Sequence, residues 1–322
     1  MDRTRAGSFV VCTGGVARHY SLLTGWGASY PATTGYIVPT FISEGRSRGS
    51  HNLLKRAQRM FDWLVSVQMP CGVFQGSTVA SSVVVPVPFN TGQILLGLAA
   101  GVAEFGQTYR EAMMAAADWL VRTQDRDGFW RKHPSPFAAP REKTTRLTRP
   151  GGLFEAVRLG AGHAYAEAAM RNAYWALSHQ NDNSWFALTD PSSPLTHTIG
   201  YILWGLLEAY RFSGDRKILQ GAIRTAEGAL RALRPDGHLP GRLDSHWRGT
   251  VKWSCLTGTE QIAICGLLLY RDTADARFRS AAVAANRYVR QTVRIDGPRE
   301  TRGAVKGSFP ISGGYERFLY PN

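Results

Sequence analysis

One histidine has the sequence setting that proton transfer requires. His197 stands between two threonines, and a run of apolar residues begins two positions later, so we expect it in the first turn of a buried helix. A sheltered imidazole there titrates near neutral pH and can act as a general base. Tyr201 follows four residues later, and Tyr36 has equivalent sequence surroundings nearer the N-terminus. Either phenol can be the partner acid; the structural alternatives are a capping or core histidine and tyrosines packed in the core.

A carboxylate, Glu260, is the second chemical candidate. Hydrolysis of a glycosidic bond uses two carboxyl groups that face each other across the bond. Glu260 begins another apolar run, and Glu155, Glu316 and Asp244 are its available partners. The structural alternative is a first-turn glutamate that interacts with the positive end of its helix.

Side chains suited to hold a sugar occur at matching positions. Asn90 and Gln93 can neutralise a substrate carboxylate, and aromatic rings can stack on sugar rings. The further binding candidates are Trp26, Tyr30, Trp247, Trp253, Gln261 and Tyr315. Trp130 and Trp185 are better explained as residues that seal a repeated turn. No histidine or cysteine spacing typical of zinc sites occurs, so we expect neither metal ligands nor a cofactor.

These candidates belong to a pattern that recurs through the chain. Three stretches share a tryptophan, a glutamine five residues later and a turn residue four residues after that: Trp63, Gln68 and Gly72; Trp119, Gln124 and Gly128; Trp175, Gln180 and Ser184. With weaker copies at Gly237 and Gly297, neighbouring turns are 56, 56, 53 and 60 residues apart. A period of this size indicates an array of equivalent supersecondary units.

Each unit contains two kinds of helix. Residues 94–100 and 202–207 are apolar on nearly every face, which indicates buried inner helices. Residues 109–122 and 217–233 keep their charges on one side, which indicates half-exposed outer helices. Six inner-helix starts align, the last near residue 313. We therefore predict an all-α (α/α)6 toroid in a single domain, residues 1–322, in which residues 1–26 or a missing C-terminal segment would complete the ring.

Two families resemble this chain. Ala116, Trp119, Leu120, Gln124, Gly128 and Trp130 resemble the Gln-Trp repeat of triterpene cyclases, which are α/α barrels. In that family the glutamine caps the next turn and the tryptophan seals it, so the resemblance implies architecture rather than chemistry. The acidic Asp-x-Asp-Asp motif of the cyclases is absent.

The inner-helix starts carry the second resemblance. Residues 89–93, 196–201, 205–208 and 213–215 are similar to stretches of carbohydrate-active toroids, namely unsaturated glucuronyl hydrolases, N-acylglucosamine 2-epimerases and toroidal polysaccharide lyases. This resemblance implies that the inner-helix N-termini open into one pocket, where the candidate residues converge. The uronyl hydrolases have a catalytic Asp; Asn90, which stands at the matching position, cannot donate a proton as an acid.

The charge balance points to an acidic partner. Lys and Arg number 38 against 24 Asp and Glu, which gives a formal net charge of +14. Such an excess favours a polyanion, here an acidic glycan, although a merely basic protein is the alternative. The cations are spread out and no nucleic-acid motif occurs, so we expect no nucleic-acid partner. No signal peptide or membrane-spanning run is visible, which predicts a cytoplasmic protein without excluding export.

Together these features predict an enzyme that acts on an acidic, uronate-containing poly- or oligosaccharide. The first hypothesis is lyase or epimerase chemistry, with His197 and a tyrosine transferring protons and Asn90 or Gln93 holding the carboxylate. The second is a glycoside hydrolase of the unsaturated-uronyl-hydrolase type that uses Glu260. The third is a non-catalytic toroid that binds a glycan or a protein in polysaccharide biosynthesis. The sugar, its linkage, the oligomeric state and any metal dependence stay open.

Overall fold

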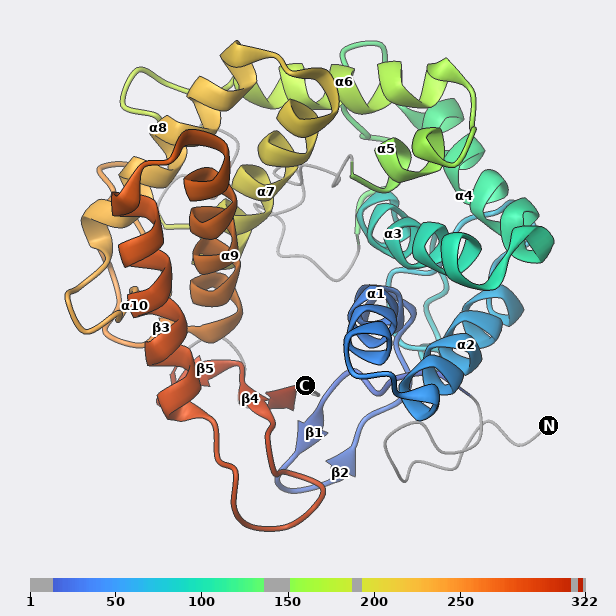
Figure 1. Ribbon diagram of the computed structural model, residues 1–322, viewed down its shortest axis with the longest axis horizontal. Helices are drawn as coiled ribbons and strands as arrows, with labels where there is room; N and C mark the ends of the chain where they lie inside the picture. The colour runs from blue at the N-terminus through green and yellow to red at the C-terminus, as the bar shows by residue number, and fades with distance from the viewer. Residues whose placement is uncertain (1–13, 136–150, 187–192, 314–317, 321–322) are drawn as a thin grey trace. The chain divides into compact units, whose positions relative to one another are not determined.

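The computed structural model describes residues 14–135, 151–186, 193–313 and 318–320. These residues fall into two compact units, drawn in Figure 1. The first contains residues 14–135 and 151–172, and the second contains the described residues from 173 onward. The single-domain organisation stays a prediction.

The first unit is built from helices that alternate between two layers. Its elements are β1 (Tyr20–Ser21), β2 (Gly25–Trp26), α1 (Pro31–Ser47), α2 (His51–Ser66), α3 (Pro88–Phe105), η1 (Gln107–Tyr109), α4 (Arg110–Thr123) and α5 (Gly151–Arg158). The inner helices α1, α3 and α5 pack on one another in turn, while α2 and α4 cover α1 and α3 from outside (Figure 1). Helix α6 (His163–Leu177) continues from this unit into the second.

The second unit repeats the same alternation. Its helices are α7 (Thr196–Ser213), α8 (Arg216–Ala232), α9 (Leu256–Thr273) and α10 (Ala276–Thr292). Helices α7 and α9 pack side by side as inner helices, with α8 and α10 outside (Figure 1). Two short antiparallel pairs complete it: β3 (Ser254–Cys255) with β5 (Ser308–Phe309), and β4 (Val305–Lys306) with β6 (Leu319–Tyr320).

The predicted helix types are confirmed along the described chain, which holds five inner–outer pairs. Gly313 lies in a turn after β5, while Gly314 and Tyr315, where a sixth inner helix was expected to begin, lie outside the described residues. Within the same ranges, no helix combines the length and apolar character that crossing a bilayer requires.

Glycines allow the inner helices to approach closely. A Cβ added to Gly97 would lie 2.5 Å from the carbonyl oxygen of Gly35, and one added to Gly152 would lie 2.7 Å from that of Gly92. Real Cβ atoms are not found at such distances, so any side chain would push α1, α3 and α5 apart.

The repeated turn joins each outer helix to the next. The Gln68 amide, after α2, donates to the carbonyls of Gly72 (2.7 Å) and of Ala112 in α4 (2.8 Å). The Gln124 amide, after α4, donates to the carbonyls of Gly128 (2.9 Å) and of Ala168 in α6 (2.8 Å). Each glutamine therefore closes its own turn and also satisfies a carbonyl of the following outer helix, as the cyclase resemblance implied.

A further copy of this turn lies near the N-terminus. Gly14 has a φ of +87°, and its Cα approaches the carbonyl oxygen of Arg59 in α2 so closely that a Cβ would lie 2.3 Å away. Gly72 has a φ of +90°, and a Cβ added to it would likewise lie 2.3 Å from the carbonyl oxygen of Ala115 in α4. Residues 14–16 thus act as a turn that precedes α1, as residues 72–74 precede α3. The sequence pattern hides this copy because Val10, rather than a glutamine, stands four residues before Gly14.

Removing one of these glutamines should loosen the array. Gln124→Ala loses three hydrogen bonds, the two that its amide donates to carbonyls and the one that it accepts from Arg171, so we expect the free energy of unfolding to fall by about 1–3 kcal/mol. Urea denaturation followed by circular dichroism measures the change. Gln220→Ala, at an exposed position of α8, is the matched control and should stay within about 0.5 kcal/mol of wild type. Equal effects of both substitutions would contradict the structural role of Gln124.

Candidate active site

His197 lies in the first turn of α7, where the N-termini of two inner helices meet. The backbone N–H of Thr196 donates to the Gly241 carbonyl at 3.0 Å, which attaches the start of α7 to the loop before β3. On the α9 side, a Cβ added to Gly258 would lie 2.5 Å from the backbone nitrogen of His197. The missing side chain at Gly258 therefore lets α9 come directly against the start of α7.

The imidazole of His197 has an aromatic and a sulfur neighbour. Tyr201, one turn further along α7, presents its ring edge-on to the imidazole, with 5.7 Å between ring centroids. On the other side, Nδ1 of His197 lies 3.9 Å from Sγ of Cys255. His197 and Tyr201 are both partly exposed, whereas Cys255 is buried. The arrangement leaves an imidazole and a phenol in reach of solvent, with a thiol behind the imidazole.

Cys255 is the member of this group that the sequence reasoning missed. It ends β3 and is the residue that immediately precedes α9, and it lies 58 positions from His197. No short motif connects the two residues. A repeat alignment that extended to the residue before each inner helix would have singled it out, because Tyr30 holds the corresponding place before α1.

Trp253 lies near the start of α7. A Cβ added to Gly241 would meet the Trp253 ring at 2.1 Å, and the Gly241 N–H donates to the Trp253 carbonyl at 2.7 Å. The Gly241 carbonyl also accepts from the Thr196 N–H, so Gly241 connects Trp253 to the start of α7. The Trp253 indole is partly exposed. The described second unit thus brings together His197, Tyr201, Cys255 and Trp253.

Trp247 does not have the open face that a sugar platform needs. It is only 3% exposed, its ring meets that of Trp185 edge-on at 5.0 Å, and its indole N–H donates to the Asn183 carbonyl at 2.9 Å. A Cβ at Gly228 of α8 would lie 2.2 Å from this ring. The indole thus packs against an outer helix in this structure, and its contact with a substrate stays a prediction.

Glu260 faces the outer helix of its own pair. Asn286 of α10 donates to one carboxylate oxygen at 2.6 Å. Burial raises the pKa of the Glu260 carboxyl above its usual range, while the Asn286 hydrogen bond and the charge of Arg290 act in the opposite direction. The neighbouring Gln261 is also buried and packs against Gly200 of α7. The catalytic role proposed for Glu260 stays a prediction, but its carboxylate contacts α10 and not His197.

In the first unit, the amide candidates are buried. Asn90 is 2% exposed and donates to the Tyr30 hydroxyl at 2.7 Å, and Gln93 is fully buried. The Tyr30 hydroxyl also lies 3.5 Å from the Gly76 carbonyl, to which it donates. These contacts connect α3 with the residue before α1. They give Asn90 a structural partner, and its role in holding a substrate carboxylate stays a prediction.

The remaining candidates are an exposed set of aromatics and one undescribed residue. Tyr36 is partly exposed on α1, and Trp26 of β2 packs edge-on against Tyr20 with 4.9 Å between centroids. Tyr315 lies outside the described residues. Across the described ranges, no three His, Cys, Asp or Glu side chains gather as metal ligands would.

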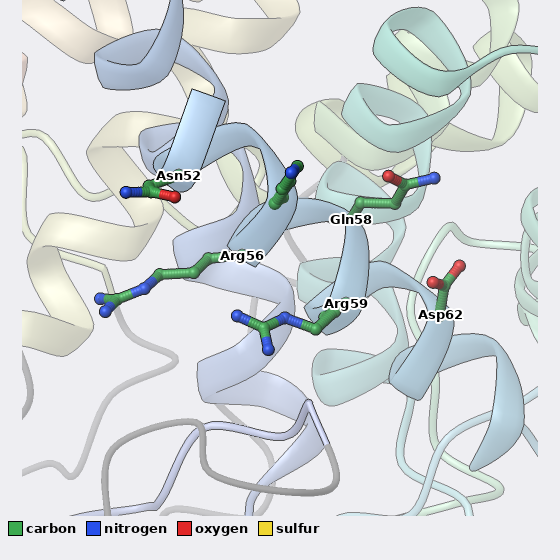
Figure 2. A pocket seen from close by; sticks show the side chains of 6 residues that line it. Asn52, Arg56, Gln58, Arg59 and Asp62 are labelled. Atoms are coloured by element: carbon green, nitrogen blue, oxygen red, sulfur yellow. The ribbon is translucent and has the colours of Figure 1, made fainter. Parts of the chain in front are cut away.

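A surface hollow of about 510 Å³ lies elsewhere, against the outer helix α2 (Figure 2). Its lining residues are Asn52, Lys55, Arg56, Gln58, Arg59 and Asp62. None of the predicted site residues lines it.

The sequence and the structure were each compared with those of known proteins. No family model matches the sequence, and no curated protein matches it. Solved structures do: a cellobiose 2-epimerase from Bacillus thermoamylovorans B4167 is 11% identical with a TM-score of 0.75, over 92% of this chain and 84% of that one. An unsaturated glucuronyl hydrolase from Bacillus sp. GL1, responsible for the degradation of glycosaminoglycan, is 16% identical with a TM-score of 0.72, over 95% and 87%. A D-mannose isomerase is 11% identical with a TM-score of 0.71, over 92% and 84%.

These likenesses confirm the predicted fold class. The chain has the (α/α)6-toroid fold that these carbohydrate epimerases, hydrolases and isomerases share. Because the identities are 11–16%, the comparisons establish the fold and leave the reaction to be argued from the residues.

The setting of Glu260 predicts a pH-dependent stability. A carboxyl whose pKa is raised in the folded state stabilises the fold below its unfolded pKa, and this contribution is lost as pH rises through the folded pKa. Glu260→Gln keeps an acceptor for Asn286 and removes the buried charge. We therefore expect this variant to be more stable than wild type at neutral pH, with the difference shrinking under acid conditions.

Thermal unfolding of both proteins across a pH series measures this difference, with Glu167→Gln, at an exposed position of the outer helix α6, as the surface control. A difference between Glu260→Gln and wild type that is independent of pH would contradict the burial of the Glu260 charge.

Proposed function

We propose that the chain is a carbohydrate-active enzyme that transfers protons on an acidic sugar, with its reactive groups at the N-terminal ends of α7 and α9. The observation that carries the proposal is the partly exposed pair His197 and Tyr201, whose rings lie 5.7 Å apart between centroids. An imidazole and a phenol in one site are a base and an acid for carbon–hydrogen chemistry. The fold shared with carbohydrate-active enzymes supports a sugar as the substrate.

The chemistry follows from the acidity of the hydrogen next to a sugar carboxylate or carbonyl. In a lyase, the neutral imidazole of His197 takes that hydrogen as a proton, the electron pair forms a carbon–carbon double bond, and the bond to the leaving oxygen breaks. Tyr201 then supplies the proton that the leaving oxygen needs. In an epimerase, the proton is returned to the same carbon from the opposite face, and no bond to oxygen breaks.

The charge of the chain supports an acidic sugar. Cations exceed anions by 14, and the positive ends of α7 and α9 meet at His197. Helix N-termini favour anions. A substrate carboxylate placed there would be stabilised as negative charge develops on the carbon that loses its proton. Trp253 is the aromatic surface proposed to contact the sugar ring. In the first unit, Tyr36, Tyr30 and Trp26 stay candidates for sugar contact.

The hydrolase alternative has less support in the described residues. The first turns of α1, α3 and α7 contain no carboxylate. Glu260 contacts Asn286 of α10, and Glu155 of α5 is paired with Arg158. These contacts give neither Glu260 nor Glu155 a facing carboxylate, whereas His197 and Tyr201 supply a base and an acid in contact.

Substitution of His197 tests the proposed base. We expect His197→Ala to lower turnover of an acidic oligosaccharide by about 10²-fold or more, because general base catalysis is worth that much. The assay is a panel of uronate-containing and neutral glycans, read by the ultraviolet absorbance of unsaturated products, by new reducing ends and by epimer analysis. His163→Ala, at an exposed position of α6, should retain wild-type turnover.

Two results would overturn the assignment: full turnover by the folded His197→Ala protein, or new reducing ends without unsaturated or epimerised sugar. Binding without turnover on every glycan would favour the non-catalytic alternative.

Cys255 is expected to act as a positioning residue for His197. A thiol beside Nδ1 holds the ring so that Nε2 is the nitrogen open to a substrate. Cys255→Ala should lower turnover between about twofold and tenfold, the equivalent of one hydrogen bond, and Cys255→Ser should recover most of it. Nitrogen chemical shifts of the His197 ring and the pH profile of turnover are the readouts. Unchanged shifts and pH profile in Cys255→Ala would show that the thiol only fills space.

A further inference from the structure

Three cations on the outer helix α2 form a surface that the proposed reaction does not use. Lys55, Arg56 and Arg59, here called the α2 basic surface, line the hollow of about 510 Å³ together with Asn52, Gln58 and Asp62. Figure 2 shows the guanidinium groups of Arg56 and Arg59 extending from the same side of α2, with Gln58 and Asp62 extending from the other. This surface lies in the first unit, whereas His197, Tyr201 and Cys255 lie in the second.

The three cations repel one another and have no ion-paired acid in the part of the chain that the structure describes. Their spacing places Lys55 and Arg59 four residues apart and Arg56 and Arg59 three apart, which are the separations at which like charges on a helix repel. No described carboxylate forms an ion pair with any of them. Asp62, the acid in the hollow, instead accepts a hydrogen bond from the Tyr109 hydroxyl.

The repeat shows that the fold does not require cations at these positions. In α4, 56 residues later, Lys55, Arg56 and Arg59 correspond to Glu111, Ala112 and Ala115. Asp62, by contrast, corresponds to Asp118, which accepts from Tyr165 as Asp62 accepts from Tyr109. The acid in the hollow is therefore a structural residue of the repeat, whereas α4 has no cation at any of these three positions.

In the next repeat only one of the three positions carries a cation, and that cation has a structural role. In α6 the corresponding residues are Glu167, Ala168 and Arg171. The guanidinium of Arg171 donates to the Gln124 side chain at 2.9 Å, so this arginine takes part in the repeated turn. Arg59 has the same place in α2. The turn that packs against it is the one at Gly14, and Val10 stands where the later copies of this turn have a glutamine. The Arg59 side chain therefore does not take part in such a turn and instead lines the hollow.

We propose that the α2 basic surface binds an acidic polysaccharide chain through its carboxylate or sulfate groups, with the amides of Asn52 and Gln58 contacting hydroxyls. The inference rests on the proposed function for the choice of a polysaccharide. Exposed arginines form paired hydrogen bonds with such anions. Single-stranded nucleic acids depend on aromatic side chains for base stacking, and no aromatic residue lines the hollow.

A charge-matched pair of variants tests the proposal. The first carries Lys55→Gln, Arg56→Gln and Arg59→Gln. The control carries Arg216→Gln, Lys217→Gln and Arg231→Gln, which removes the same three charges from exposed positions of α8. Isothermal titration with polygalacturonate, heparin, neutral dextran and a single-stranded DNA oligonucleotide gives affinities for both variants and wild type. Circular dichroism establishes that each is folded.

We expect the α2 variant to bind polygalacturonate or heparin about tenfold more weakly than wild type, since three exposed charge contacts are worth roughly 1–2 kcal/mol together. The control should stay within about twofold, and dextran should not bind. Equal weakening of both variants would show that net charge alone attracts the polymer, and an unchanged α2 variant would show that the surface is not used. Tighter binding of DNA than of either polysaccharide, lost in the α2 variant, would also overturn the proposal.

The outcome is separate from that of the reaction. Binding and turnover are separate readouts of wild type and of the α2 variant, so either proposal can fail without the other. If no glycan is turned over while the α2 variant still loses binding, the proposed catalysis fails and the polysaccharide surface stands.

Discussion

The close fit between each turn and the next outer helix determines the rest of the structure. Gly72 and Gly128 adopt φ values of +90° and +98°, and a Cβ on either would lie within 2.5 Å of a carbonyl oxygen of the following outer helix. Gln68 and Gln124 then connect each turn to that helix through carbonyls 44 residues further on. Because this contact recurs at nearly constant spacing, it sets where every inner helix begins. Chemical groups at those starts are therefore placed by the repeat rather than by a local motif.

The same constraint operates where the inner helices meet. Gly258 lets α9 approach the backbone of His197, and this approach brings Cys255, three residues earlier in the chain, within 3.9 Å of the imidazole. A side chain at Gly258 would separate the thiol from the ring and displace the start of α7. Close packing thus limits the orientations that the His197 ring can adopt. In many catalytic histidines a hydrogen-bonded carboxylate has this effect.

The fold could be predicted from the sequence because its determinants repeat visibly. Trp, Gln and Gly recur with a fixed spacing, and the inner and outer helices differ in how their apolar residues are distributed. The site was harder, since exposure and facing direction depend on contacts between distant segments. Trp247 packs against Trp185 and Gly228, and Glu260 faces Asn286. The sequence alone had suggested that Trp247 and Glu260 would both be accessible to a substrate. Cys255 was missed because only folding brings it to His197. The turn at Gly14 was missed because it lacks the glutamine that marks the later copies.

The most direct test of the account is whether the protein removes a carbon-bound hydrogen from an acidic sugar. Incubation of wild type with uronate oligosaccharides in deuterated water, followed by proton NMR, detects the hydrogen next to the carboxylate or carbonyl. The account predicts that this signal disappears, through exchange with deuterium or conversion to an unsaturated product, and that it persists with His197→Ala. Cleavage of the glycan by wild type with this hydrogen retained would contradict proton abstraction and would favour hydrolysis.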